Sequence, residues 1–445
     1  MSVLLCTRRA LGAAAALAGL ALLGTRLPWA RDALLAADAV LALLVWADAR
    51  RAAAAVGAAG EATLAVTREA PPAFSVGRPA EVAYRWRNAG RRAARLRIRE
   101  IRPELLGGAQ PPRRIAIPAG GAVRDVVTVT PVRRGRERAG VLAVDSVGPL
   151  GLGVRRTTLA LPWDAVVYPP LVPARQRAWI AQAARRREPG LVAARRLGQG
   201  RLFESLREWV PGDDLRRIDW KATAKRGKVI ARQYEAERRQ RVLLVLDTGR
   251  LLAEEIAGAA RLDHAVRAAL ELAYAATQHD DDVGVMTFAD GVRHFVAPQR
   301  GRAGLKRVLD VLAVVEPVPV EPDYPGAFRY LAVRSRKRAL TVLFTDVIDR
   351  FASEALVANV ASLRPRHLPL AVTLRNPAID RVAASRPATA PEAFRKAAAE
   401  ELVRAREEAL GHMRRAGVEV VDVGPGRAGE AVVAAYLALK RRGRL

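Results

Sequence analysis

Two aspartates stand where buried strands are expected to end. Asp247 follows the apolar run 242–246, and Asp346 follows the run 341–345. Ligands of open α/β sheets bind at the carboxyl ends of the strands, and carboxylate oxygens are ligands for hard cations such as magnesium. These two aspartates are therefore the candidate metal ligands. The competing interpretation is that each one caps the loop or helix that follows it.

Motifs for nucleotide binding or catalysis are incomplete in this sequence. Residues 424–429 fit G-x-G-x-x-G, but the 16 residues that remain cannot complete the strand–helix–strand unit that binds a dinucleotide. Residues 222–229 approach a phosphate-binding loop, except that Val229 replaces the hydroxyl that would bind magnesium. No ligand-spaced pair is formed by the five histidines, His264, His279, His294, His367 and His412. We therefore expect no enzyme, no catalytic residue and no cofactor other than a divalent cation such as magnesium.

The charge balance is strongly basic. The 445 residues include 74 Lys and Arg against 45 Asp and Glu, which gives a formal net charge of +29. Such a balance favours anionic partners, namely nucleic acid, an acidic membrane face or an acidic protein, without choosing among them. A hydrophobic content of 51% is enough for packed cores. The single cysteine, Cys6, excludes a disulfide framework and cysteine-based metal centres.

Two apolar runs lie near the N-terminus. Residues 10–25 carry no charge, and residues 33–47 carry only Asp38. Each run is shorter than the roughly 20 residues that span a bilayer, but flanking arginines can reach the interfaces. The sequence therefore predicts a transmembrane helical hairpin over residues 1–52, in the cell inner (cytoplasmic) membrane, with the soluble domains facing the cytoplasm. A cleaved export signal is the alternative.

Two folded domains are predicted after these runs. Short alternating stretches between Pro- and Gly-rich turns predict a β-sandwich over residues 61–161. Over residues 241–445, apolar strands such as 368–374 alternate with helical patterns such as 261–278. This alternation predicts an α/β doubly wound domain around a parallel sheet. The charged segment 170–240 is expected to connect the two domains.

Residues 203–224 read FESLREWVPGDDLRRIDWKATA. This run, the hallmark segment, resembles the motif F-x-x-L-R-x-[YW]-x-P-G-D-D-x-R-x-I-D-W-x-x-[TS]-A of the bacterial domain of unknown function 58 family. Residues 131–135 and 148–152 resemble further segments of that family, so the resemblance covers nearly the whole chain. The hallmark turn is interpreted either as a buried clasp between domains or as a partner-binding surface. Its candidate residues are Arg207, Trp209, Pro211, Gly212, Asp213, Asp214, Arg216, Asp219 and Trp220.

The resemblance implies a von Willebrand factor type A-like fold for residues 241–445. Such domains often bind a divalent cation through D-x-S-x-S, a threonine in a second loop and an aspartate in a third. Here residues 247–251 read DTGRL, residues 321–325 contain no threonine, and only Asp346 matches the third position. The lost hydroxyls and the added charge of Arg250 disfavour a metal.

Members of the family are commonly encoded beside MoxR-type AAA+ ATPases. The resemblance therefore implies a membrane-anchored adaptor or assembly factor, whose von Willebrand-like domain binds a MoxR-type AAA+ ATPase and a client protein. Membrane-tethered nucleic-acid binding by the basic stretch 185–241 is the alternative, although aromatic residues for base stacking are sparse there. A hydrolase that uses Asp213, Asp214 or Asp247 is a third interpretation.

Overall fold

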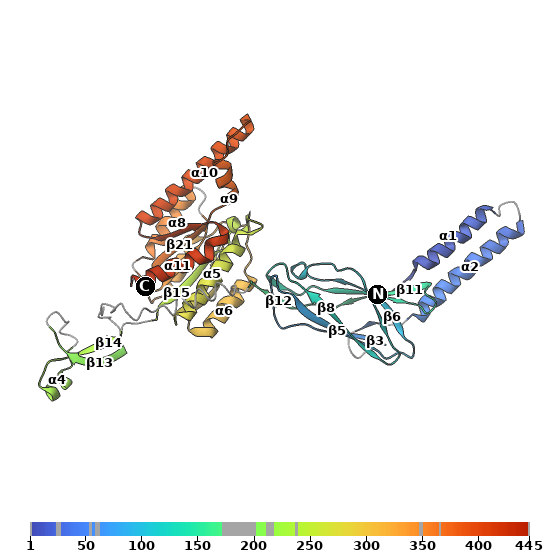
Figure 1. Cartoon of the computed structure of the whole chain (residues 1–445), viewed down its shortest axis with the longest axis horizontal. Helices are drawn as coiled ribbons and strands as arrows, with labels where there is room; N and C mark the ends of the chain where they lie inside the picture. Colours follow the sequence, from blue (N-terminus) through green and yellow to red (C-terminus); the bar gives the residue numbers. More distant parts are fainter. Residues whose placement is uncertain are drawn as a thin grey trace. The chain divides into compact units, whose positions relative to one another are not determined.

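The computed structural model describes residues 2–23, 28–52, 56–57, 63–170, 202–210, 218–235, 239–346, 350–364 and 366–443. The chain divides into two compact units, Met1–Pro170 and Leu171–Leu445 (Figure 1). Each unit is described by itself below. The division into four segments that the sequence suggests stays a prediction.

The first unit is built on β-sheets whose strand pairs are antiparallel, except that β2 pairs with β3 and β4 pairs with β12 in parallel. One sheet has the strand order β2-β3-β5-β8, a second has the order β1-β11-β10-β6-β7, and a short third has the order β4-β12-β9. Alternate residues of β6 are buried, as expected for strands that cover a core on one face. The bounds are β1 Ser2–Cys6, β2 Val56–Gly57, β3 Leu64–Glu69, β4 Phe74–Ser75, β5 Ala80–Asn88, β6 Ala94–Ile101, β7 Arg113–Ile117, β8 Ala122–Val129, β9 Gly135–Glu137, β10 Val141–Val147, β11 Gly153–Ala160 and β12 Ala165–Tyr168.

The prediction of a transmembrane hairpin over residues 1–52 is wrong. The chain begins with strand β1, which pairs antiparallel with β11, and helices α1 (Arg8–Leu23) and α2 (Pro28–Arg51) follow. Within the described residues, no helix combines the length and the apolar character needed to cross a membrane. Helix α1 has only 16 residues, and α2 carries aspartates and arginines along its 24 residues, so neither run meets the requirement.

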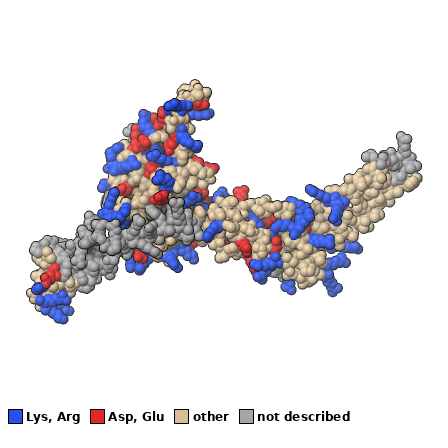
Figure 2. Space-filling model, in the orientation of Figure 1, with Lys and Arg blue, Asp and Glu red and all other residues tan. Residues whose placement is uncertain are grey.

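Several large apolar side chains of these helices are exposed. Figure 2 shows this end of the first unit as a mostly uncharged surface. Exposed residues include Leu11, Leu20, Leu35, Leu43 and Trp46. The predicted location at the cytoplasmic membrane depended on the hairpin, and it stays a prediction.

Asp48 fastens α2 to the sandwich. Its carboxylate accepts hydrogen bonds from three backbone N–H groups in the turn after β10 and at the start of β11: Leu150 at 2.8 Å, Leu152 at 2.8 Å and Gly153 at 2.9 Å. A Cβ atom on Gly148 would lie 2.3 Å from the Asp48 carboxyl carbon, so only glycine allows this approach. The segment 148–152, which carries part of the family resemblance, thus forms the backbone contact site for helix α2.

The second unit contains a six-stranded sheet in the order β19-β18-β15-β20-β21-β22. All neighbouring strands are parallel except β19, which pairs antiparallel with β18. The strand bounds are β15 Arg241–Asp247, β18 Asp282–Phe288, β19 Val292–Gln299, β20 Leu340–Phe344, β21 Leu368–Leu374 and β22 Glu419–Val423. Most buried residues of the central strands are apolar on both faces, which is the pattern of a sheet covered on both sides.

Helices cover both faces of this sheet (Figure 1). One core joins the sheet to α5 (Arg261–Gln278), α6 (Gly301–Val314) and α11 (Ala428–Arg441). The other core joins it to α7 (Tyr324–Arg334), α8 (Arg350–Ser362) and α10 (Ala390–Arg415). The short helix α9 (Pro377–Ala383) follows β21 and packs on α10. The unit is therefore a mixed α/β fold, and its likeness to a von Willebrand domain stays a prediction.

Candidate functional site

Asp247 lies buried at the end of β15, and described neighbours occupy both of its carboxylate oxygens. Oδ1 accepts a hydrogen bond from the Gly249 backbone N–H at 2.7 Å. Oδ2 accepts two hydroxyl hydrogen bonds, from Tyr324 at 2.8 Å and from Thr345 at 2.8 Å. Burial raises the pKa of the Asp247 carboxyl, and these three donors only partly offset that rise.

The Tyr324 hydroxyl is a contact that sequence reasoning missed. It comes from the region 321–325, where no threonine is present, and it supplies a hydroxyl from the start of α7 instead. The phenol also lies 2.7 Å from the Thr345 hydroxyl. Burial, followed by the charge of Asp247, raises the pKa of Tyr324 well above its usual value, so the phenol stays protonated and able to donate.

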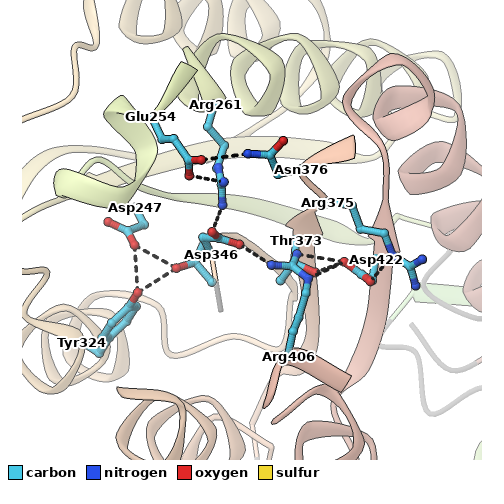
Figure 3. A network of polar contacts seen from close by, with 11 residues as sticks. Asp247, Glu254, Arg261, Tyr324, Asp346, Thr373, Arg375, Asn376, Arg406 and Asp422 are labelled. Carbon is cyan, nitrogen blue, oxygen red and sulfur yellow. Dashed lines mark hydrogen bonds and ion pairs between the residues drawn. The ribbon is translucent and has the colours of Figure 1, made fainter. Parts of the chain in front are cut away.

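Asp346 is buried at the end of the neighbouring strand β20, between two arginines. Its Oδ1 accepts a hydrogen bond from Arg406 of α10 at 2.7 Å, and its Oδ2 is paired with Arg261 at the start of α5 (Figure 3). Arg261 is itself only 2% exposed. A buried carboxylate needs such partners, because an unpaired buried charge is very costly.

The ion pairs continue on both sides of Asp346. Arg261 also pairs with Glu254, whose other oxygen accepts a hydrogen bond from the Asn376 amide at 2.9 Å. On the other side, Arg406 donates to Asp422 of β22 at 2.9 Å. Figure 3 shows these residues as one continuous polar network across the ends of the strands.

Asp422 closes the network. Its carboxylate accepts hydrogen bonds from Arg375 at 2.7 Å and from the Thr373 hydroxyl at 2.8 Å, in addition to Arg406. Burial alone would raise the pKa of Asp422, but Arg406, Arg375 and Thr373 together outweigh burial and lower it. The carboxylate therefore stays ionised at neutral pH.

The residues at the strand ends do not fit a hard divalent cation. The oxygens of Asp247 are engaged by N–H and O–H donors, and those of Asp346 by guanidinium groups. A divalent ion would have to displace Arg261 or Arg406 and would be repelled by their charges. Among the described residues, moreover, no cluster of three or more His, Cys, Asp or Glu is arranged to hold a metal. Asp247 and Asp346 thus act as anchors for hydroxyl and arginine side chains.

A cleft of about 330 Å³ opens beside the network. Its apolar wall contains Ile379 of α9 with Leu402 and Val403 of α10. Its polar wall contains six charged residues of the network, namely Glu254, Arg261, Asp346, Arg375, Arg406 and Asp422. The side chain of Leu402 is apolar, yet it is 40% exposed. The cleft lies at the carboxyl edge of the sheet, where open α/β folds bind their ligands. A second cleft of about 580 Å³, lined mostly by residues of α7 and α8, also combines apolar side chains with arginines, but it contains none of the aspartates at the strand ends.

The hallmark segment is described only in part. Strands β13 (Leu202–Glu208) and β14 (Ile230–Glu235) form an antiparallel pair, and Asp219 caps α4 (Trp220–Arg226) by accepting from the Ala222 N–H at 3.0 Å. Trp209 is half-buried, whereas Trp220 is 69% exposed and does not act as a core anchor. The side chain of Arg207 and the turn residues Pro211, Gly212, Asp213, Asp214 and Arg216 lie outside what the structure describes.

Asp219 is thus a helix cap, and the other roles predicted for the hallmark segment stay predictions. Nucleic-acid binding by the stretch 185–241 also stays a prediction, because residues 185–201, 211–217 and 236–238 of this stretch are not described.

Residues 205–404 match the family model described as protein of unknown function DUF58. The match includes most of the hallmark segment, together with Asp247, Asp346 and the apolar wall of the cleft. Arg406 and Asp422 lie beyond it. The resemblance seen in the sequence is confirmed over this range, and its extension to the rest of the chain stays a prediction.

The curated relatives do not add a function. An uncharacterized protein of Mycobacterium bovis and one of Mycobacterium tuberculosis are each 28% identical to this chain over 183 residues. These alignments cover 40% of this chain and 55% of the relatives, so the chain spans about half the length of the curated relatives it matches.

Two solved structures show a distant likeness to this chain. The CARDB domain of the PF1109 protein from Pyrococcus furiosus is 16% identical with a TM-score of 0.18, covering 23% of this chain and 87% of that domain. Proximal thread matrix protein 1 from the mussel byssus is 12% identical with a TM-score of 0.27, covering 45% of this chain and 46% of that protein.

Proposed function

We propose that this chain is a non-enzymatic adaptor whose α/β unit binds a protein partner in the cleft at the carboxyl edge of the sheet. The observation that carries the proposal is the composition of the cleft. Its polar wall is held rigid by paired charges, and its apolar wall leaves Leu402 partly exposed. A rigid polar wall beside exposed apolar groups suits the anchor residue of a partner protein.

The contacts of the carboxylates support binding over catalysis. A general base or a nucleophile must have a free atom to offer to the substrate. Asp247 and Asp422 each use both of their oxygens on neighbouring donors, and Asp346 uses one oxygen on a donor and the other in an ion pair with Arg261. Their engagement makes them positioning groups for the walls of a binding site.

The partner class that we propose is a MoxR-type AAA+ ATPase, with a client protein as the further partner. This part of the proposal rests on the family resemblance of residues 205–404. The exposed apolar side chain of Leu402 supplies the place on the chain where such a partner would make contact.

Affinity capture with a matched pair of variants tests this function. The tagged full chain is incubated with a MoxR-type ATPase from the same genome, with and without ATP, in nuclease-treated buffer. We expect stoichiometric capture by the wild-type chain, loss of capture for Leu402→Asp, and full capture for Val333→Asp. Val333 is an equally suitable control because it is 64% exposed on α7, outside the cleft. Capture that is the same for both variants would contradict the proposal.

A further inference from the structure

The charges that line the cleft are unequal in number. Three arginines face five carboxylates. The three arginines and three of the carboxylates alternate in one chain of ion pairs, in the order Glu254, Arg261, Asp346, Arg406, Asp422, Arg375. This chain is neutral as a whole, so it offers no net attraction to a charged ligand.

Two carboxylates of the cleft do not belong to this chain of ion pairs. Asp380 belongs to α9 and Glu407 to α10, and both line the cleft. Neither side-chain carboxylate forms a hydrogen bond or an ion pair with another residue among those that the structure describes, and Asp380 interacts with Arg375 only by longer-range electrostatic attraction. The cleft therefore carries an excess of two negative charges.

The apolar wall stands between the same two helices. Ile379 precedes Asp380 on α9, and Leu402 and Val403 lie about one helical turn before Glu407 on α10. A ligand that enters here meets aliphatic surface along its stem and carboxylates near its head. An arginine side chain has that shape, with three methylene groups that pack on apolar surface and a guanidinium that pairs with carboxylates.

We propose that the cleft receives an arginine side chain of the partner protein. This inference rests on the proposed function, since it names the chemistry of the partner at the same cleft. Charge complementarity supports it: the chain as a whole has a net charge of +29, so a basic partner is repelled by most of its surface and attracted where two carboxylates are in excess.

Short peptides test the recognised chemistry without the ATPase. Acetyl-Ala-Arg-Ala-amide is titrated into the full chain and its binding followed by ligand-observed NMR. The same peptide with citrulline has nearly the same shape without the charge, and the same peptide with glutamate reverses the charge. We expect the arginine peptide to bind about fivefold more tightly than the citrulline peptide, with no binding of the glutamate peptide.

A pair of double variants locates the effect in the cleft. Asp380→Asn/Glu407→Gln should reduce binding of the arginine peptide to the citrulline level. Glu316→Gln/Glu408→Gln removes the same charge from exposed positions outside the cleft and should leave binding unchanged. Equal binding of the arginine and citrulline peptides, tighter binding of the glutamate peptide, or equal effects of the two double variants would overturn the inference.

The peptide assay tests the arginine site and the ATPase capture tests the adaptor function, so one result can be negative while the other is positive. Capture of the ATPase that depends on Leu402 but not on Asp380 and Glu407 would overturn the arginine and keep the adaptor. Arginine-selective peptide binding in the cleft, with no capture of the ATPase, would overturn the proposed partner and keep the arginine site.

Discussion

Asp48 in the first unit and Asp346 in the second are both buried carboxylates, but their partners differ in kind. Asp48 accepts hydrogen bonds from three N–H groups within the single segment 148–153, so its contacts are confined to that segment. Asp346 is bound by two arginines, and each of these continues to a further carboxylate. The first arrangement is a clasp between two elements. The second spans the edge of a sheet and forms one wall of a cleft.

The difference shows what a buried carboxylate can be used for. Backbone donors satisfy a charge locally and leave nothing exposed. Side-chain cations reach farther, and their own remaining donors must be satisfied in turn, which extends the network to the surface at Arg375. A functional site is therefore expected at Asp346 and a structural contact at Asp48. The predictions below test this contrast.

Replacing Asp48 should have the largest effect on stability. Asp48→Ala leaves the three N–H groups of the turn without an acceptor, and we expect the local opening free energy to fall by about 4 kcal/mol. Hydrogen exchange at the amides of Leu150, Leu152 and Gly153 measures this loss directly. Asp38→Ala is the control, because Asp38 is exposed on the same helix. A change below about 1 kcal/mol would show that the turn does not depend on Asp48.

Replacing Arg261 should have the next largest effect. Arg261→Met removes the guanidinium from Glu254 and Asp346 and leaves the buried Asp346 paired with Arg406 alone. We expect the free energy of unfolding of the second unit to fall by about 3 kcal/mol in urea titrations. Arg267→Met, on an exposed position of the same helix, should change it little. Equal stability of the two variants would contradict the role of the network in the fold.

Replacing Asp247 should have a smaller effect on stability, and this effect should depend on pH. Because its pKa is raised in the folded chain, the folded state binds more protons than the unfolded state above the unfolded value of about 4. This carboxyl therefore lowers stability as pH rises from that value through its folded pKa. Asp247→Asn removes the titration, so the stability of the wild type relative to the variant should decline over this window. Urea titrations at several pH values measure the difference, and a rise with pH would contradict the assignment.

The sequence predicts those parts of the fold that depend on local pattern. The helix 261–278 and the strand 368–374 are confirmed with the predicted bounds, because periodicity and apolar runs are local signals. The positions of Asp247 and Asp346 at strand ends follow from the same signals. The transmembrane hairpin was wrong because two short apolar runs were given the role of longer spans, while residues 2–6 pair with a strand more than 140 positions away.

The contacts that make the candidate site could not be predicted in this way. Arg406 is 60 positions from Asp346, and Tyr324 is 77 positions from Asp247, so no local spacing joins them. The helix α9, which carries Ile379 and Asp380, has only seven residues and gives little periodic signal. The von Willebrand motif calls for a threonine near residue 324, so it gave no signal for the tyrosine hydroxyl that donates a hydrogen bond to Asp247.

The central claim is that the cleft, and not another exposed face, contacts the partner. A photo-cross-linking amino acid is placed at position 402, which borders the cleft, and in a second sample at position 333 on α7. Each full chain is irradiated with the MoxR-type ATPase in the presence of ATP, and the adducts are measured by mass spectrometry. We predict an ATPase adduct from position 402 and none from position 333. An adduct from position 333 alone, or no adduct from position 402, would contradict the account.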